Sequence, residues 1–215
     1  MARILLCSAT AFEIQPTIDV IAQYKDAMEV LVTGVGMMET AFALATRLSA
    51  SSHTILLQAG IAGCMEPAFA LSSVVAIGSD GIGDQGVFER GVFRNTFDLG
   101  FGNPDDGIWR GGRLPNESGL PERSGLPLVA AVSVNHISTN AAQIDHYRQS
   151  CGAVAESMEG AAFHYAARKW GLPFLQLRAF SNYIGERDKS KWQLRESIAA
   201  LNEQLQNIIP QLLSQ

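Results

Sequence analysis

The stretch that decides the fold is Met28-Glu-Val-Leu-Val-Thr-Gly-Val-Gly-Met-Met-Glu39. Its apolar first half, residues 28–33, predicts a buried strand, and residues 38–50 continue with the spacing of an amphipathic helix. Gly34 and Gly36 lie at the junction, where glycine lets the backbone approach a ligand closely. This order indicates an α/β fold with a ligand site at the turn. The alternative is a tight turn with no binding role.

Similar apolar runs recur along the chain. We expect further strands over residues 3–7, 54–58, 73–77, 128–134, 153–155 and 174–180. Several of these runs are apolar on both faces, which indicates a covered sheet. Apolar side chains at helical spacing predict helices over residues 158–166 and, in a longer stretch, residues 194–212. The alternation of strands with helices predicts one α/β domain over residues 1–215.

The segment from Gly102 to Pro127 breaks this pattern. It contains six glycines and four prolines, which are too frequent for a regular helix or strand. We therefore expect a long loop, and long loops in compact domains are usually functional or disordered.

Composition excludes several classes of protein. Hydrophobic residues make up 47% of the chain and charged residues 17%, which is typical of a globular enzyme. The net charge of −5 leaves no basic stripe for nucleic-acid phosphates. The longest apolar stretch, residues 55–77, is broken by Glu66-Pro67 and predicts no membrane span. Cys7, Cys64 and Cys151 are odd in number and lie in or beside apolar runs, which favours reduced thiols and a cytoplasmic protein.

Motifs for cofactors, metals and nucleophilic hydrolysis are missing. A dinucleotide-binding turn would need a third glycine at Glu39, and a phosphate-binding loop would need Gly-Lys-Ser/Thr. The four histidines show no zinc spacing, and no Gly-x-Ser-x-Gly nucleophile turn occurs. We expect neither a cofactor nor a metal ion.

Polar residues follow several of the predicted strands. Gln58-Ala-Gly-Ile-Ala-Gly63 predicts a second glycine-rich turn, at the same edge of the sheet as the first. In Glu156-Ser-Met-Glu-Gly-Ala-Ala162 a helix is expected to begin near Met158, which places Glu159 in its first turn. A carboxylate there can accept hydrogen bonds from a vicinal diol such as a ribose. Complementing the helix dipole is the simpler alternative.

Two further side chains are candidates for the same edge. Asn182, at the end of Arg178-Ala-Phe-Ser-Asn-Tyr183, offers an amide donor and a carbonyl acceptor, with a structural Asx turn as the alternative. Glu13 lies just after the first strand and can reach the same cleft. An isolated glutamate is otherwise usually solvated surface.

Together these segments resemble the nucleoside phosphorylase and nucleosidase superfamily. Within it, the chain is similar to methylthioadenosine/S-adenosylhomocysteine nucleosidases and, more closely, to futalosine hydrolases. The resemblance spans nearly the whole chain and is most specific at Ser157-Met-Glu-Gly160 and Phe180-Ser-Asn-Tyr183. It implies a nucleoside phosphorylase-like α/β domain in which helices flank a central, mixed and twisted sheet.

The resemblance also implies roles for individual residues. Glu13 would activate the attacking water, Glu159 would hold the ribose hydroxyls with Met158 beside the sugar, and Asn182 would contact the base. The catalytic residues implied are Glu13 and Asn182. The substrate-binding residues implied are Gly34, Gly36, Ala59, Gly60, Ile137, Ser157, Met158, Glu159 and Ser181.

The residue at position 182 favours one substrate. Methylthioadenosine nucleosidases carry aspartate there, whereas futalosine hydrolases resemble this chain at Asn182, Tyr183, Arg187 and Trp192. The resemblance thus implies hydrolysis of futalosine to hypoxanthine and dehypoxanthine futalosine, on a route to menaquinone. It also implies a homodimer in which residues 98–109 complete the 5′ end of a neighbouring site.

Three other functions stay open. A methylthioadenosine nucleosidase is disfavoured by Asn182. A purine nucleoside phosphorylase would need groups that bind phosphate, but no arginine occurs between Val30 and Ala45. A non-catalytic nucleoside-binding module would keep the glycine turns without needing Glu13.

Overall fold

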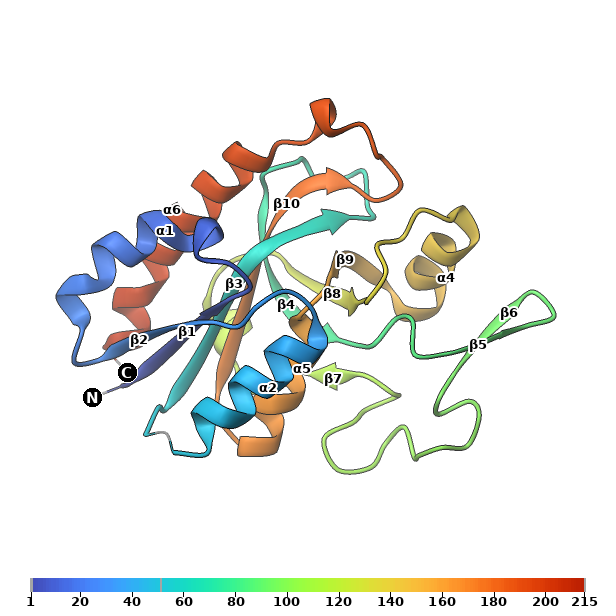
Figure 1. Ribbon diagram of the computed structural model, residues 1–215, viewed down its shortest axis with the longest axis horizontal. Helices are drawn as coiled ribbons and strands as arrows, with labels where there is room; N and C mark the ends of the chain where they lie inside the picture. Colours follow the sequence, from blue (N-terminus) through green and yellow to red (C-terminus); the bar gives the residue numbers. More distant parts are fainter. Residues whose placement is uncertain (1, 51, 215) are drawn as a thin grey trace.

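The computed structural model describes residues 2–50 and 52–214 of the chain (Figure 1). The strands are β1 (Ile4–Ser8), β2 (Met28–Val32), β3 (Ile55–Cys64), β4 (Val74–Asp80), β5 (Gly86–Glu89), β6 (Val92–Asn95), β7 (Leu114–Pro115), β8 (Leu128–Ser133), β9 (Ala153–Ser157) and β10 (Phe174–Tyr183). The α-helices are α1 (Ala11–Ile21), α2 (Met37–Leu48), α3 (Leu120–Arg123), α4 (Ala141–Cys151), α5 (Gly160–Trp170) and α6 (Leu194–Leu213). Short 3₁₀ turns, η1 (Ala22–Tyr24) and η2 (Lys189–Lys191), follow α1 and precede α6.

Strand β3 is the centre of the main sheet. It pairs in parallel with β1 and β10 and antiparallel with β9, and β1 pairs onward with β2. From β10 the pairing continues through β4 and β8 to β9, so these strands and β3 close into a ring. The sheet is therefore mixed, as the resemblance implied.

Both faces of the sheet are covered by helices. Figure 1 shows α1 with α6 on one side and α2 with α5 on the other. On β1, Ile4 and Leu6 pack toward α1 and α6, whereas Leu5 and Cys7 pack toward α2 and α5. Successive strand residues point to opposite faces, which explains why this run is apolar throughout.

The segment Gln58–Gly63 is not the turn that we expected. It continues β3 without a break as far as Cys64. A side chain at Gly60 would come within 2.5 Å of the Arg178 guanidinium, and one at Gly63 within 2.0 Å of Ile184. These glycines therefore make room for side chains from β10 and the segment after it, and do not bend the backbone.

The segment Gly102–Pro127 is mostly irregular, as expected, but it also contains β7 and α3. β7 pairs antiparallel with the end of β4, and Leu120 at the start of α3 is buried in the core. These contacts order short elements that local composition does not predict. The sequence analysis also missed α1, α4 and the β5–β6 hairpin.

No helix in the described part of the chain is both long and apolar enough to cross a membrane. Among the same residues, no three His, Cys, Asp or Glu side chains come together in a way that could hold a metal ion.

Candidate active site

A cavity of about 360 Å³ lies where β1, β3, β9 and β10 end. It is lined by the following predicted site residues: Glu13, Ile137, Ser157, Met158, Glu159, Ser181 and Asn182. Its full lining comes from six parts of the chain, residues 9–13, 35, 61–63, 137, 156–159 and 181–198. Its volume falls within the range of about 300–1,000 Å³ typical of small-molecule sites.

The structure does not bring every predicted residue to the cavity. Gly34, Gly36, Ala59 and Gly60 are absent from its lining. The Ala59 side chain lies in the hydrophobic core with α1 and α6, because it points to the opposite face of β3. Gly34 adopts a φ of +83° against the Glu39 side chain, so this position shapes the turn into α2.

Glu13 is held by donors on both carboxylate oxygens. It is in the first turn of α1, where its Oε2 accepts the Thr10 N–H at 3.1 Å and the Thr10 hydroxyl at 2.9 Å. Its Oε1 accepts the Ile61 N–H at 3.0 Å. The spacing Thr10-x-x-Glu13 is a capping-box pattern, which would have predicted the start of α1 from the sequence. The carboxylate is therefore fixed at the cavity and only 8% exposed.

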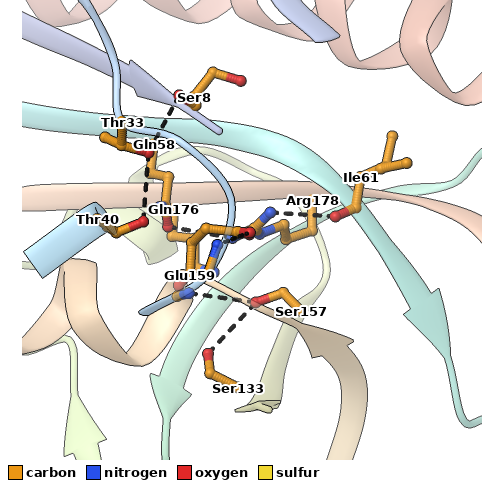
Figure 2. Close-up of polar contacts among 12 residues, drawn as sticks. Ser8, Thr33, Thr40, Gln58, Ile61, Ser133, Ser157, Glu159, Gln176 and Arg178 are labelled. Carbon is orange, nitrogen blue, oxygen red and sulfur yellow. Dashed lines mark hydrogen bonds and ion pairs between the residues drawn. The ribbon is translucent and has the colours of Figure 1, made fainter. Parts of the chain in front are cut away.

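Glu159 is part of a buried ion pair. Its Oε2 lies 3.3 Å from Arg178 Nη2 (Figure 2). Its Oε1 accepts the Gly36 N–H at 3.1 Å. We expected Glu159 in the first turn of a helix beginning near Met158, but α5 begins at Gly160 and Glu159 is its N-cap residue. The side chain makes no capping hydrogen bond, because Arg178 and Gly36 hold it instead.

Arg178 is the residue that the sequence analysis quoted but gave no role. It is 2% exposed and also donates to the Ile61 carbonyl and to Gln58 Oε1. A side chain at Gly60 would meet both Arg178 Nη1 and Glu13 Oε1, so the two groups approach each other there. The sequence does contain a signal for this role, because Arg178 is a charged residue inside the apolar run Phe174–Phe180. Buried arginines are almost always paired with an acidic group.

Polar groups under the cavity hold the start of α5. Ser133 Oγ accepts the Ala161 N–H at 2.7 Å and donates to Asp80 Oδ1 at 3.1 Å. Burial raises the pKa of the Asp80 carboxyl to about 6. Ser157 Oγ accepts the Gly160 N–H at 3.3 Å. These contacts satisfy N–H groups that the first turn of a helix leaves unpaired, and they set the position of Glu159.

Asn182 is near the end of β10 with part of its amide already engaged. Its Oδ1 accepts the Ser181 hydroxyl at 2.9 Å, and its Nδ2 donates to the Tyr183 carbonyl at 3.1 Å. One N–H of the amide is left for a ligand. The residue lies in a strand and not in the Asx turn considered as an alternative.

Glu156 is an acidic residue at the cavity to which the sequence patterns assign no role. It lines the cavity at 5% exposure, and its Oε1 accepts the Ser138 N–H at 3.0 Å. Its Oε2 is buried without a hydrogen-bond partner. Burial raises the pKa of this carboxyl, and the neighbouring backbone N–H and hydroxyl of Ser138 partly offset that effect.

The segment between β10 and α6 forms one wall of the cavity. It is anchored at both ends, because Ile184 N donates to the Cys64 carbonyl and Gln193 N to the Ser181 carbonyl, each at 2.8 Å. The Arg187 guanidinium carbon lies 5.6 Å from the centre of the Trp192 ring, and both side chains line the cavity. Among the described lining residues, Arg187 is the only one with a positive charge.

Comparison with known proteins identifies the family. No family model matches the chain. The futalosine hydrolase of Streptomyces coelicolor is 30% identical over 195 residues, which cover 88% of this chain and 81% of the relative. The chain belongs to the futalosine hydrolase family. The futalosine hydrolase of Thermus thermophilus is also 30% identical, over 83% of this chain and 80% of its own length.

Solved structures agree with this futalosine hydrolase fold. The futalosine hydrolase of Helicobacter pylori superposes with a TM-score of 0.82 at 14% identity, covering 98% of each chain. The 5′-methylthioadenosine/S-adenosylhomocysteine nucleosidase of the same organism also reaches 0.82 at 14% identity, over 98% of this chain and 99% of its own. The predicted fold class and the resemblance to the family are confirmed.

Proposed function

We propose that this chain hydrolyses the N-glycosidic bond of futalosine and releases hypoxanthine and dehypoxanthine futalosine, as a step toward menaquinone. Family membership supports the substrate, and the cavity supports the chemistry. The observation that carries the proposal is the buried cluster in which Glu13 and Glu159 line the cavity and the Arg178 guanidinium lies behind them.

This cluster fits the charges of the reaction. Cleavage of an N-glycosidic bond builds positive charge on the ribose and negative charge on the departing purine. Carboxylates beside the sugar stabilise the oxocarbenium-like state, because preorganised charges act strongly where water is excluded. Glu13 accepts a proton from the attacking water, while Glu159 accepts hydrogen bonds from the ribose hydroxyls.

Hydrolysis fits the cluster better than phosphorolysis. A phosphate anion beside Glu13 and Glu159 would be repelled by both carboxylates. The Arg178 guanidinium lies behind Gly60 and already donates to Ile61, Gln58 and Glu159. Water needs no such counter-charge.

The base is held at the other end of the cavity. The free N–H of Asn182 donates to the oxygen at position 6 or the nitrogen at position 7 of hypoxanthine. An amide cannot transfer a full proton, so it stabilises the leaving base by hydrogen bonding only. We further infer that the whole chain forms a single catalytic domain and functions as a homodimer.

The test is release of free base by the purified protein. Futalosine, inosine and methylthioadenosine are incubated with it separately, with and without phosphate, and products are separated by liquid chromatography. We expect hypoxanthine from futalosine at a rate independent of phosphate. A phosphate requirement would indicate a phosphorylase, faster release of adenine would indicate a methylthioadenosine nucleosidase, and binding without release would indicate a non-catalytic module.

A further inference from the structure

Glu156 and Asn182 face the cavity from the two strands on either side of Gly63. Asn182 pairs with Gly63 along β10, and Glu156 pairs with the same Gly63 along β9. Directly paired residues on neighbouring strands point to the same face of a sheet. Two strand spacings of about 4.8 Å separate their backbones by roughly 9.5 Å. All three residues line the cavity.

The surface between these two side chains is apolar and suits the face of a flat ring. Gly63 has no side chain, and Ile184 takes the space that one would fill. Ile184 also lines the cavity, as does Ile137 near Glu156. An apolar surface with a polar group at each side is the arrangement that binds a heterocyclic base by its face and by its edge.

The unpartnered oxygen of Glu156 needs a donor. The side chain is 5% exposed, Oε1 is occupied by the Ser138 N–H, and Oε2 has no partner. A buried acceptor without a hydrogen bond is unfavourable, so a ligand that supplies an N–H there gains affinity.

A 6-oxopurine supplies a donor and acceptors in the matching order. Along one edge it presents the N–H at position 1, the oxygen at position 6 and the nitrogen at position 7. Asn182 has one N–H available for the oxygen or for the nitrogen at position 7. Adenine presents an unprotonated nitrogen at position 1, which would face a carboxylate acceptor to acceptor.

We propose that Glu156 is a specificity-determining residue whose Oε2 accepts the N–H at position 1 of a bound 6-oxopurine. This inference rests on the proposed function and names a contact with the base that Asn182 alone does not supply. Glu156 and Asn182 then bind opposite ends of one purine edge, and both disfavour a 6-aminopurine.

The decisive experiment compares two substrates across three proteins. kcat/KM is measured for futalosine and for its 6-amino counterpart, with wild type, Glu156→Gln and the control Glu66→Gln. Glutamine keeps an oxygen for the Ser138 N–H and places an amino group where Oε2 was, which can donate to position 1 of adenine. Glu66 lies outside the cavity, with a side chain 41% exposed beside Arg148.

We expect Glu156→Gln to lower the preference for the 6-oxo substrate by at least about tenfold, while Glu66→Gln leaves it unchanged. An unchanged preference, or an equal loss on both substrates as a general structural defect would give, overturns the contact. If wild type releases no hypoxanthine from futalosine, the proposed function itself fails. If wild type cleaves futalosine and Glu156→Gln keeps the wild-type preference for the 6-oxo substrate, only the proposed contact of Glu156 is rejected.

A second measurement needs no variant and covers the case in which Glu156→Gln does not fold. Hypoxanthine and 1-methylhypoxanthine are compared as inhibitors of futalosine cleavage by wild type. The methyl group removes the N–H at position 1, so we expect inhibition to weaken by at least about tenfold. Equal inhibition by the two bases, or none by either, overturns the contact.

Discussion

At the scale of single residues, Glu13 is held in place by the backbone and also faces the cavity. Its oxygens accept the N–H groups of Thr10 and Ile61, and the same carboxylate faces the cavity. An amide in its place can accept only one of these two N–H groups. The other is left without its acceptor, which costs about 1 kcal/mol of stability.

We predict that Glu13→Gln lowers turnover of futalosine by about 10²- to 10⁴-fold, because an amide cannot take the proton of water. Ligand binding is expected to stay largely intact. Steady-state rates, calorimetric binding and thermal unfolding distinguish these effects, and Asp19→Asn on the exposed face of α1 controls for the lost charge. Near-normal turnover of the folded variant would remove Glu13 from the mechanism.

At Asn182, replacement of the amide nitrogen by an oxygen is expected to change which base the site prefers. Aspartate has nearly the same shape but offers no N–H, so its carboxylate would face the oxygen of a 6-oxopurine acceptor to acceptor. It would also face the Tyr183 carbonyl, to which the amide now donates. Such a contact costs on the order of 1 to 3 kcal/mol.

We therefore predict that Asn182→Asp lowers kcat/KM for futalosine by at least about tenfold, with a relative gain on the matching adenine nucleoside. Both specificity constants are measured for wild type and variant. If their ratio does not change, Asn182 has no part in base selection.

At the scale of elements, the junction of β9 and α5 determines where Glu159 lies. A side chain at Gly160 would come within 2.1 Å of Asp80 Oδ2 and 2.3 Å of Gln176 Nε2. Asp80 is fully buried, and its Oδ1 is held by the Gly81 N–H and the Ser133 hydroxyl. This carboxylate has little freedom to move away, so the start of α5 would shift instead.

We predict that Gly160→Ala destabilises the protein by about 1–3 kcal/mol, the usual effect of overpacking a core. It should also raise KM, because Glu159 moves with the helix. Chemical denaturation and steady-state kinetics measure the two effects. For stability alone, Gly102→Ala is the matched control, since its methyl group would meet only the Phe97 ring at 3.4 Å. Equal stability of the two variants would show that the contact with Asp80 is unimportant.

At the scale of the whole molecule, apolar side chains are exposed on α2 and on residues 98–109. Met38 is 83% exposed, Phe42 73% and Phe101 80%. Met38 lines a groove of about 490 Å³ together with Trp109 and Tyr165. Exposed apolar surface of this kind is typical of protein interfaces.

We predict a homodimer in solution, the commonest symmetric assembly, with α2 and residues 98–109 in its interface. Met38→Glu should shift it toward monomer and lower futalosine turnover, whereas Val20→Glu, on α1 across the sheet, should not. Light scattering with activity measured on dilution tests both effects. A wild-type monomer that stays active when dilute would contradict the prediction.

Local patterns in the sequence account for three of the four helices that cover the sheet, α1 excepted, and for much of the candidate site. Residues 28–33 and 38–50 predict β2 and α2 closely, and the apolar spacing of residues 194–212 predicts α6 within one or two residues. Glu13, Glu159 and Asn182 follow strands at one edge, and the structure brings them to one cavity. These predictions succeed because helix and strand periodicity is set by neighbours in the chain.

Tertiary contacts decided the rest. Gly60 and Gly63 look like turn residues from the sequence, yet they lie within a continuous strand. Arg178 and Ile184, from distant parts of the chain, occupy the space beside them. The position of Glu156 also depends on tertiary contacts, because it lies opposite Asn182 only where both residues pair with Gly63. The sequence by itself determined most strands of the main sheet, the helices α2, α5 and α6, and the polar residues near the ends of those strands. Only the tertiary structure decided that the strands close into a ring and that Arg178 and Glu156 belong to the candidate site. Strand pairing and side-chain burial bring together residues that lie far apart in the chain, and the local sequence around each residue does not show which distant residue it will meet.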